Sequence, residues 1–219
     1  DDMVYAQYLR DNGADWQVAY VLRRDEYENL DSDVNTFAIK YHGFAGSNEY
    51  DLLLAQHYGD TVVGLGGSVP WGGALLRGDV TATDSEDGTS WSAVASWSWS
   101  WLGMGKNMTA AMEYFYSGFG QDHEQYAPPQ LAENPELVSR ILRGELYTLG
   151  KQYLAASLLV EVTPLLQVTP NLFINLEDQS LLTQLVGQYS VAENWQLLLA
   201  LNVPVGSSGS EYGGFASGV

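Results

Sequence analysis

The segment Ser90–Trp101 reads Ser-Trp-Ser-Ala-Val-Ala-Ser-Trp-Ser-Trp-Ser-Trp. Because side chains of an extended strand alternate between two faces, Trp91, Trp97, Trp99 and Trp101 share one face and the serines share the other. A soluble core would have to bury these large rings and find a partner for every indole N–H. Lipid would cover the rings instead, while water in a lumen would cover the serines. The segment therefore predicts a lipid-facing strand of a transmembrane β-barrel.

Composition is compatible with this prediction. The 219 residues include 27 acidic and 9 basic ones, for a formal net charge of -18, which argues against binding nucleic acid through a basic patch. Cysteine is absent, so disulfides and thiol chemistry are excluded. No run approaches the roughly 18 consecutive apolar residues of a transmembrane helix. A membrane-embedded chain of this kind would therefore cross as strands.

The alternating pattern recurs along the whole chain, in segments of about ten residues separated by polar or glycine-rich breaks. We expect an all-β fold, an antiparallel up-and-down transmembrane barrel of about twelve strands, forming a single domain over residues 1–219. A soluble β-sandwich is the alternative, although its strands would leave wide apolar patches. The first and the last four strands are expected at Met3–Arg10, Tyr153–Val162, Asn171–Glu177, Leu181–Ser190 and Trp195–Val205.

The break over residues 119–150 is longer than the others. Asn134 has the chemistry of a helix N-cap, Pro135 suits the first helical position, and Gly144 suits a C-terminal stop. We expect one short helix over residues 135–143 in a long loop. Because the long, acidic breaks alternate with short ones, the long set is expected on the external side.

Strand parity divides the polar residues from the apolar ones. Tyr114 and Tyr116 join the four tryptophans on the predicted lipid face, and Arg140 and Arg143 of the long loop are candidates for a constriction. The predicted lumen is lined by polar side chains that include both positive and negative charges, so it indicates neither an anion channel nor a cation channel. Its residues are Arg23, Lys40, His42, Asp51, His57, Arg77, Asp79, Glu113, Glu161, Asn175, Gln188 and Asn202.

Several runs in the second half of the chain are similar to a known group. They are Arg143-Gly144-Glu145-Leu146-Tyr147, Tyr153-Leu154-Ala155-Ala156, Glu161-Val162-Thr163-Pro164-Leu165-Leu166, Asn175-Leu176-Glu177-Asp178 and Gly209-Ser210-Glu211-Tyr212-Gly213. Together they resemble the later half of uncharacterised porin-like outer-membrane proteins of Gram-negative bacteria. The resemblance implies a fold and a location but no site. With the loop pattern, it leads us to expect a portion of a larger barrel, although an even number of strands could also close alone.

No residues are expected to be catalytic. Some twelve-stranded barrels are lipases, but their serine and histidine lie at the outer surface, whereas the parity of His42 and His57 points them inward. The acidic runs Asp25–Glu28 and Ser85–Gly88 lack the ligand spacing of a calcium loop, so neither a metal nor a cofactor is expected.

The function expected from these features is that of a porin-like channel in the bacterial outer membrane, for passive or facilitated diffusion of small polar solutes. Its partners would be outer-membrane lipid, lipopolysaccharide and the solutes, without nucleic acid. The alternatives are a scaffold barrel with a closed lumen, holding a partner lipoprotein or a surface polymer, and an outer-membrane lipase. If the chain is a portion of a larger barrel, the missing strands of that barrel would be further partners.

Overall fold

The computed structural model describes residues 2–24, 32–122 and 126–213, and these residues are mainly β-strand. They include two short α-helices, α1 (Pro128–Leu131) and α2 (Pro135–Leu142), and the 3-10 turn η1 (Ser32–Val34). The twelve strands are β1 (Asp2–Leu9), β2 (Asp15–Leu22), β3 (Thr36–Ala45), β4 (Asn48–His57), β5 (Asp60–Trp71), β6 (Ala74–Ser85), β7 (Gly88–Gly103), β8 (Lys106–Ser117), β9 (Gln152–Thr163), β10 (Leu166–Asn175), β11 (Leu181–Ala192) and β12 (Trp195–Val205).

Strand order follows chain order from β1 to β12, and the recorded pairings are antiparallel. This confirms the predicted twelve-stranded, antiparallel up-and-down sheet. The described sheet is not closed, because its order begins at β1 and ends at β12. None of the described helices is long and apolar enough to cross a membrane.

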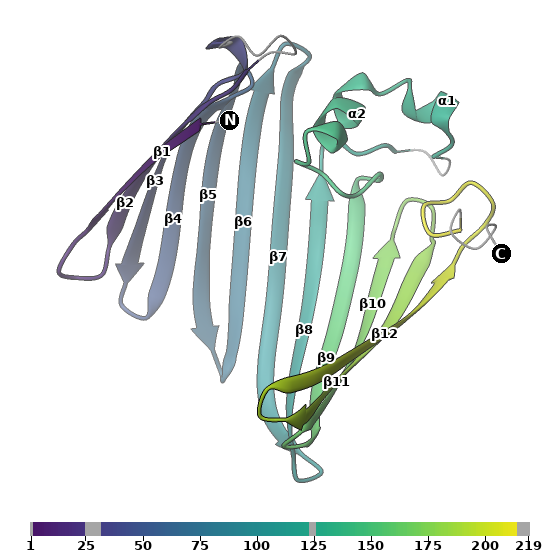
Figure 1. Cartoon of the computed structure of the whole chain (residues 1–219). Helices are drawn as coiled ribbons and strands as arrows, with labels where there is room; N and C mark the ends of the chain where they lie inside the picture. The colour runs from purple at the N-terminus through teal and green to yellow at the C-terminus, as the bar shows by residue number, and fades with distance from the viewer. Residues whose placement is uncertain (1, 25–31, 123–125, 214–219) are drawn as a thin grey trace. The chain divides into compact units, whose positions relative to one another are not determined.

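The chain divides into two compact units. Unit 1 comprises Asp1–Trp71 and Leu76–Val94, and unit 2 comprises Gly72–Leu75 and Ala95–Val219. Unit 1 therefore holds β1 to β5 with most of β6 and the start of β7. Unit 2 holds the rest of β7, β8 to β12 and both helices, which lie beyond one end of its strands (Figure 1).

The strand bounds given above agree with the structure to within two residues, except at the start of β10. β12 has the predicted bounds, whereas β10 begins at Leu166 rather than at Asn171. Proline has no N–H for a sheet ladder, so the interior of a strand is an unfavourable place for it. In the structure Pro170 lies inside β10 opposite Leu185, and the recorded β9 pairing omits Thr169 and Pro170. The strand thus accommodates a proline that interrupts one ladder locally.

The predicted helix is confirmed as α2. The Asn134 side chain accepts a hydrogen bond from the Leu137 N–H at 3.1 Å, Pro135 occupies the first turn, and Gly144 has a φ of 73°. The helix ends at Leu142, one residue earlier than predicted. The four-residue α1 was not predicted, because it is too short to show a helical period.

Most apolar strand residues stay exposed instead of forming a core. Leu54 of β4 is 55% exposed, Leu65 of β5 56% and Leu201 of β12 61%. Several of the buried apolar side chains, including Phe119, Tyr126 and Leu137, instead lie in the segment between β8 and β9. Within the described residues, packing is therefore concentrated around this segment, while the strands keep an exposed apolar face.

Candidate functional site

Strand register sorts the side chains of each unit onto two faces, because directly paired residues point to the same side. In unit 1, His42 pairs with Asp15 on one side and Asp51 on the other, while Tyr41 pairs with Trp16 and Leu52. We call the first face the polar face and the second the apolar face. Predicted lumen residues of β3 and β4 that lie on the polar face are Lys40, His42, Asp51 and His57.

Several predicted lumen charges of unit 1 are paired with one another. The Asp51 carboxylate contacts Lys40 Nζ at 3.0 Å and His42 Nδ1 at 3.0 Å. On β6, Arg77 Nε donates to Asp79 Oδ2 at 3.2 Å. Nearby opposite charges therefore offset each other, as expected for a mixed polar wall.

A shallow groove of about 150 Å³ lies between the Lys40–Asp51 ion pair and Asp79. Lys40, Asp51 and Asp79 line it together with Gly64 and Gly66 of β5. A Cβ atom at Gly66 would lie 2.1 Å from Asp79 Oδ1, so only glycine leaves room for the carboxylate in this position. Gly64 and Gly66 therefore form the floor of a polar groove.

Arg23 and His57 meet at the hydroxyl of Thr36. Arg23 Nη1 donates to Thr36 Oγ1 and to the Val34 carbonyl oxygen at 2.9 Å, and His57 Nδ1 lies 2.7 Å from the same hydroxyl. The Arg23 guanidinium also stacks over the Tyr58 ring, 4.4 Å from its centroid. The structure thus gives His57 a threonine partner and His42 a carboxylate partner.

The polar face of unit 2 carries a row of neutral groups. Ser157, Asn171, Gln184 and Asn202 lie directly opposite one another across β9 to β12. Asn171 Nδ2 donates to Gln184 Oε1 at 3.1 Å, and Gln184 Nε2 donates to Asn202 Oδ1 at 2.8 Å. Gln188 lies on the same face opposite Gln167. This face is therefore hydrogen-bonding but largely uncharged.

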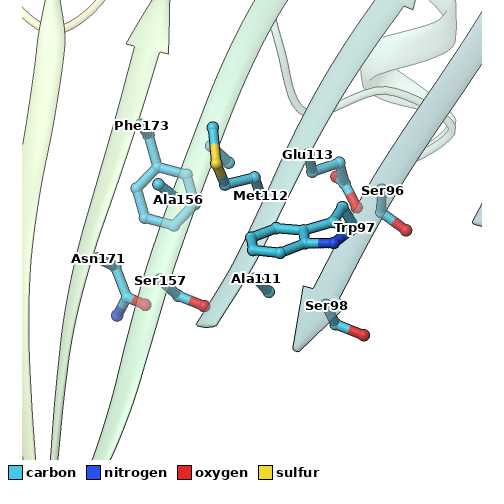
Figure 2. Close-up of a pocket in the computed structure, with 11 residues that line it drawn as sticks. Ser96, Trp97, Ser98, Ala111, Met112, Glu113, Ala156, Ser157, Asn171 and Phe173 are labelled. Atoms are coloured by element: carbon cyan, nitrogen blue, oxygen red, sulfur yellow. The ribbon is translucent and has the colours of Figure 1, made fainter. Parts of the chain in front are cut away.

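A pocket of about 340 Å³ lies on β7 to β10 of unit 2 (Figure 2). The lining residues that share the polar face come in two cross-strand rows, Glu113 with Ala155 and Phe173, and Ala111 with Ser157 and Asn171. Ala111, Ala155 and Ser157 are the small members of these rows, and the larger side chains of Trp97 and Met112 also line the pocket. Glu113 is the one predicted lumen residue that lines it.

Glu161 and Asn175 also lie on the polar face, but their surroundings differ from those of Glu113. Glu161 Oε2 accepts a hydrogen bond from Asn107 Nδ2 at 2.6 Å, near the turn between β7 and β8. Asn175 is fully buried, with 0% of its surface exposed. Loop segments cover it, so in this structure its amide is not exposed to solvent.

Asn175 belongs to a buried polar cluster that the sequence did not predict, which we call the loop cluster: Tyr126, Tyr153, Asn175 and Glu211. Asn175 Nδ2 lies 3.0 Å from Tyr126 Oη and 2.8 Å from Glu211 Oε2, and Tyr153 Oη donates to the same carboxylate at 2.5 Å. Gly150 N donates to Tyr153 Oη at 2.6 Å. The cluster therefore ties the segment between β8 and β9, and the loop after β12, to the strand ends.

Burial sets the titration of the loop residues in this cluster. It raises the pKa of the Glu211 carboxyl, although the groups that donate to it, Tyr153 and Asn175 first among them, oppose the shift. Burial likewise raises the pKa of Tyr126 and raises that of Tyr212 to about 12. Glu211 thus holds its proton to a higher pH than an exposed glutamate does.

The two arginines predicted to narrow a channel are engaged within their own segment. Arg140 is 5% exposed, contacts Glu136 and Glu145 at 3.0 and 2.9 Å, and stacks 3.8 Å from the centroid of the Phe119 ring. Arg143 Nε lies 3.0 Å from Glu145 Oε1. Both guanidinium groups thus stabilise the segment between β8 and β9, and a role in a constriction stays a prediction.

The tryptophans of β7 form a ladder on the apolar face. Trp99 stacks on Trp101 with ring centroids 4.9 Å apart, and Trp97 lies 6.2 Å from Trp99. Trp91 on the same strand is 56% exposed. On β8, Tyr114 pairs with Leu154 and Tyr116 with Gln152, so both tyrosines belong to the same face as Met112. Contact of these rings with lipid stays a prediction.

Among the described residues, no group of three or more His, Cys, Asp or Glu side chains is placed to hold a metal ion. The acidic run Asp25–Glu28 lies outside the described residues. Comparisons with protein-family models, with curated proteins and with solved structures returned no match.

Sequence reasoning missed Tyr126, Tyr153 and Glu211 as partners of Asn175. Glu211 lies 36 positions from Asn175, in a loop of glycine and serine, and no periodic pattern connects them. The signal in the sequence was the run Gly209–Gly213, which contains Glu211 and Tyr212. This run was singled out only because it contributes to the resemblance to porin-like proteins.

Proposed function

We propose that this chain is a porin-like β-barrel of the bacterial outer membrane that allows passive or facilitated diffusion of small polar solutes. The observation that carries the proposal is the register of each unit, which combines an exposed apolar face with a hydrogen-bonding polar face. Lipid would cover the first face, and water and solute would contact the second.

The apolar face suits lipid better than water. Its exposed side chains are contiguous across neighbouring strands, as in the directly paired residues Leu54 and Val63, or Leu185 and Leu201. An apolar patch that spans several strands is rare on a soluble monomer unless another surface covers it. The Trp97, Trp99 and Trp101 ladder adds amphipathic rings, which are enriched where membranes meet water.

Insertion into lipid also requires a partner for each edge of the sheet. In hydrocarbon every backbone N–H and C=O must be satisfied, and β1 and β12 are the edge strands of the described sheet. The proposal therefore requires that both strands find backbone partners in the membrane.

Planar-bilayer conductance of the refolded chain, recorded beside a gel shift between heated and unheated samples, tests the proposal. Steady channels with a folded gel shift are the expected result. A sample with no folded shift and no channels in any lipid would contradict it.

Quenching of tryptophan fluorescence by brominated lipid tests the membrane contact separately. Replacing Trp97, Trp99 and Trp101 with Phe should remove most of the quenching. The comparison variant Trp195→Phe, at the first residue of β12, should remove little of it. Equal loss in the two variants would argue that the ladder is not in contact with lipid.

A barrel with a closed lumen and a structural role is a second candidate, and the loop cluster favours it. Tyr153, Asn175 and Glu211 fix two loop segments against the strand ends of unit 2 through buried hydrogen bonds. Such a cover would suit a plug more than an open mouth. A folded gel shift without conductance would support this candidate over the channel.

A further inference from the structure

The pocket on the polar face of unit 2 has a defined width. Glu113, Ala155 and Phe173 lie in one cross-strand row, so the backbone positions of the outer two are about two strand spacings, or about 10 Å, apart. Only the methyl group of Ala155 stands between them. The Glu113 carboxylate and the Phe173 ring therefore rise from the same face and line one pocket, on strands that β9 separates; in Figure 2 the carboxylate is directed toward Ser96.

The carboxylate of Glu113 is the one charged group that lines this pocket. Unit 2 contains four basic residues, Lys106, Arg140, Arg143 and Lys151. Lys106 donates to the Val162 carbonyl, Lys151 pairs with Asp122, and both arginines pair with Glu145. The basic side chains of the unit are thus held at its turns and loops, and none of them lines the pocket.

Each of the other polar groups of the pocket has an oxygen that can accept a hydrogen bond. Asn171 Nδ2 is committed to Gln184 Oε1, and the Asn171 amide oxygen lies on the side of Ser157 in Figure 2. Ser96 and Ser98 of β7 contribute hydroxyl groups at the opposite end. Oxygen acceptors and an aromatic ring without a competing cation form an environment that suits positive charge.

We propose that this pocket binds an organic cation, an alkylammonium group held between the Glu113 carboxylate and the Phe173 ring. The inference deepens the proposed function, on which it rests, by naming the class of solute that the polar face would select. A cation over a ring is attracted when it lies within about 6 Å of the centroid, and the exposed Glu113 side chain would turn toward such a cation from across β9. A neutral solute of the same shape would lose both attractions.

Equilibrium dialysis of radiolabelled choline against the refolded full chain tests the inference directly. The detergent should be a maltoside, since amine-oxide and phosphocholine detergents carry competing cationic groups. The matched control ligand is 3,3-dimethyl-1-butanol, which has the shape of choline but no charge. We expect saturable choline binding that weakens with added salt, and no competition by the neutral analogue.

Two variants locate the site. Glu113→Gln should weaken choline binding by about tenfold, which corresponds to the loss of one favourable charge contact. Phe173→Leu should weaken it by about fivefold, and Phe173→Tyr should restore it because the ring is kept. The control Glu161→Gln removes a carboxylate from the same face that already accepts a hydrogen bond from Asn107, and binding should not change.

Folding of every variant is checked by the gel shift. Absence of choline binding to the folded wild-type chain would overturn the inference, as would equal losses in Glu113→Gln and Glu161→Gln, which would indicate only a general effect of charge. Because dialysis needs no membrane current, failure of the channel proposal would show as absent conductance with choline binding intact. Failure of the site would show as conductance without choline binding.

Discussion

Replacing Asn175 with Ala tests whether the loop cluster fastens the loop segments to the sheet. The Asn175 side chain is fully buried, and both its amide nitrogen and its amide oxygen form hydrogen bonds. Nδ2 donates to Tyr126, Tyr153 and Glu211, and Oδ1 accepts from the Glu177 N–H at 2.9 Å. Alanine would fill part of the space but could make none of these bonds.

Two groups would lose a partner that they need. The Glu211 carboxylate would lose a donor at 2.8 Å, and the Glu177 N–H would lose its acceptor. A buried polar group left unsatisfied costs about 1–3 kcal/mol. Because Tyr153 and Leu149 still donate to Glu211, we expect a loss of roughly 3 kcal/mol in the free energy of unfolding rather than the full sum.

Urea unfolding of the folded chain in lipid vesicles, followed by the gel shift, measures this loss. The matched control is Asn202→Ala, which removes an exposed amide from the end of the row on β10 to β12. Its cost should stay below about 1 kcal/mol. If Asn175→Ala is no more destabilised than Asn202→Ala, the cluster does not anchor the loops and the argument for it is wrong.

Three further changes probe separate features. Gly66→Ala places a Cβ 2.1 Å from Asp79 Oδ1, so it should destabilise unit 1 by roughly 1–2 kcal/mol, and Asp79→Ala in the same chain should recover most of the loss in urea unfolding. Asn134→Ala removes the N-cap of α2 and should cost about 1 kcal/mol, measured as faster hydrogen exchange of the Leu137 amide, while exchange in β12 stays unchanged. Burial raises the pKa of Glu211, so the folded form binds its proton more tightly; stability is highest below the ordinary glutamate pKa and falls as pH rises through the raised value. Glu211→Gln should flatten this pH profile of urea midpoints, and an unchanged profile would assign the dependence to another group.

Periodicity made most strands predictable because apolar and polar side chains alternate along each strand, one kind on each face. Tryptophan alternates with serine in β7, and that single pattern fixes both the extended backbone and the assignment of faces. Register then follows, since a shift by one residue would exchange the two faces. The α2 helix was equally predictable, because its capping residues Asn134 and Gly144 act locally.

The loop cluster could not be predicted in the same way. Asn175 parity assigns it to the polar face, which the pairing with Tyr153 supports, but burial depends on loops that arrive from distant parts of the chain. The Tyr126 backbone N–H, for example, bonds to the Gly209 carbonyl oxygen at 3.0 Å. Alternation indicates which face of the sheet a side chain occupies. Whether loops cover that face depends on loop segments, whose sequences show no periodic pattern.

The polar face of unit 2 contains two neighbouring rows of side chains that differ in their chemistry. On the polar face, Asn171, Gln184 and Asn202 satisfy one another, so a solute competes there with hydrogen bonds that already exist. Glu113 is exposed and lies in the adjacent cross-strand row. Its neighbours in that row, Ala155 and Phe173, have no amide group. A charged group in that position gains more from a cationic solute than the amide row gains from a neutral one. Selectivity on this face should therefore depend on one carboxylate and one ring rather than on the many polar residues that the alternation reveals.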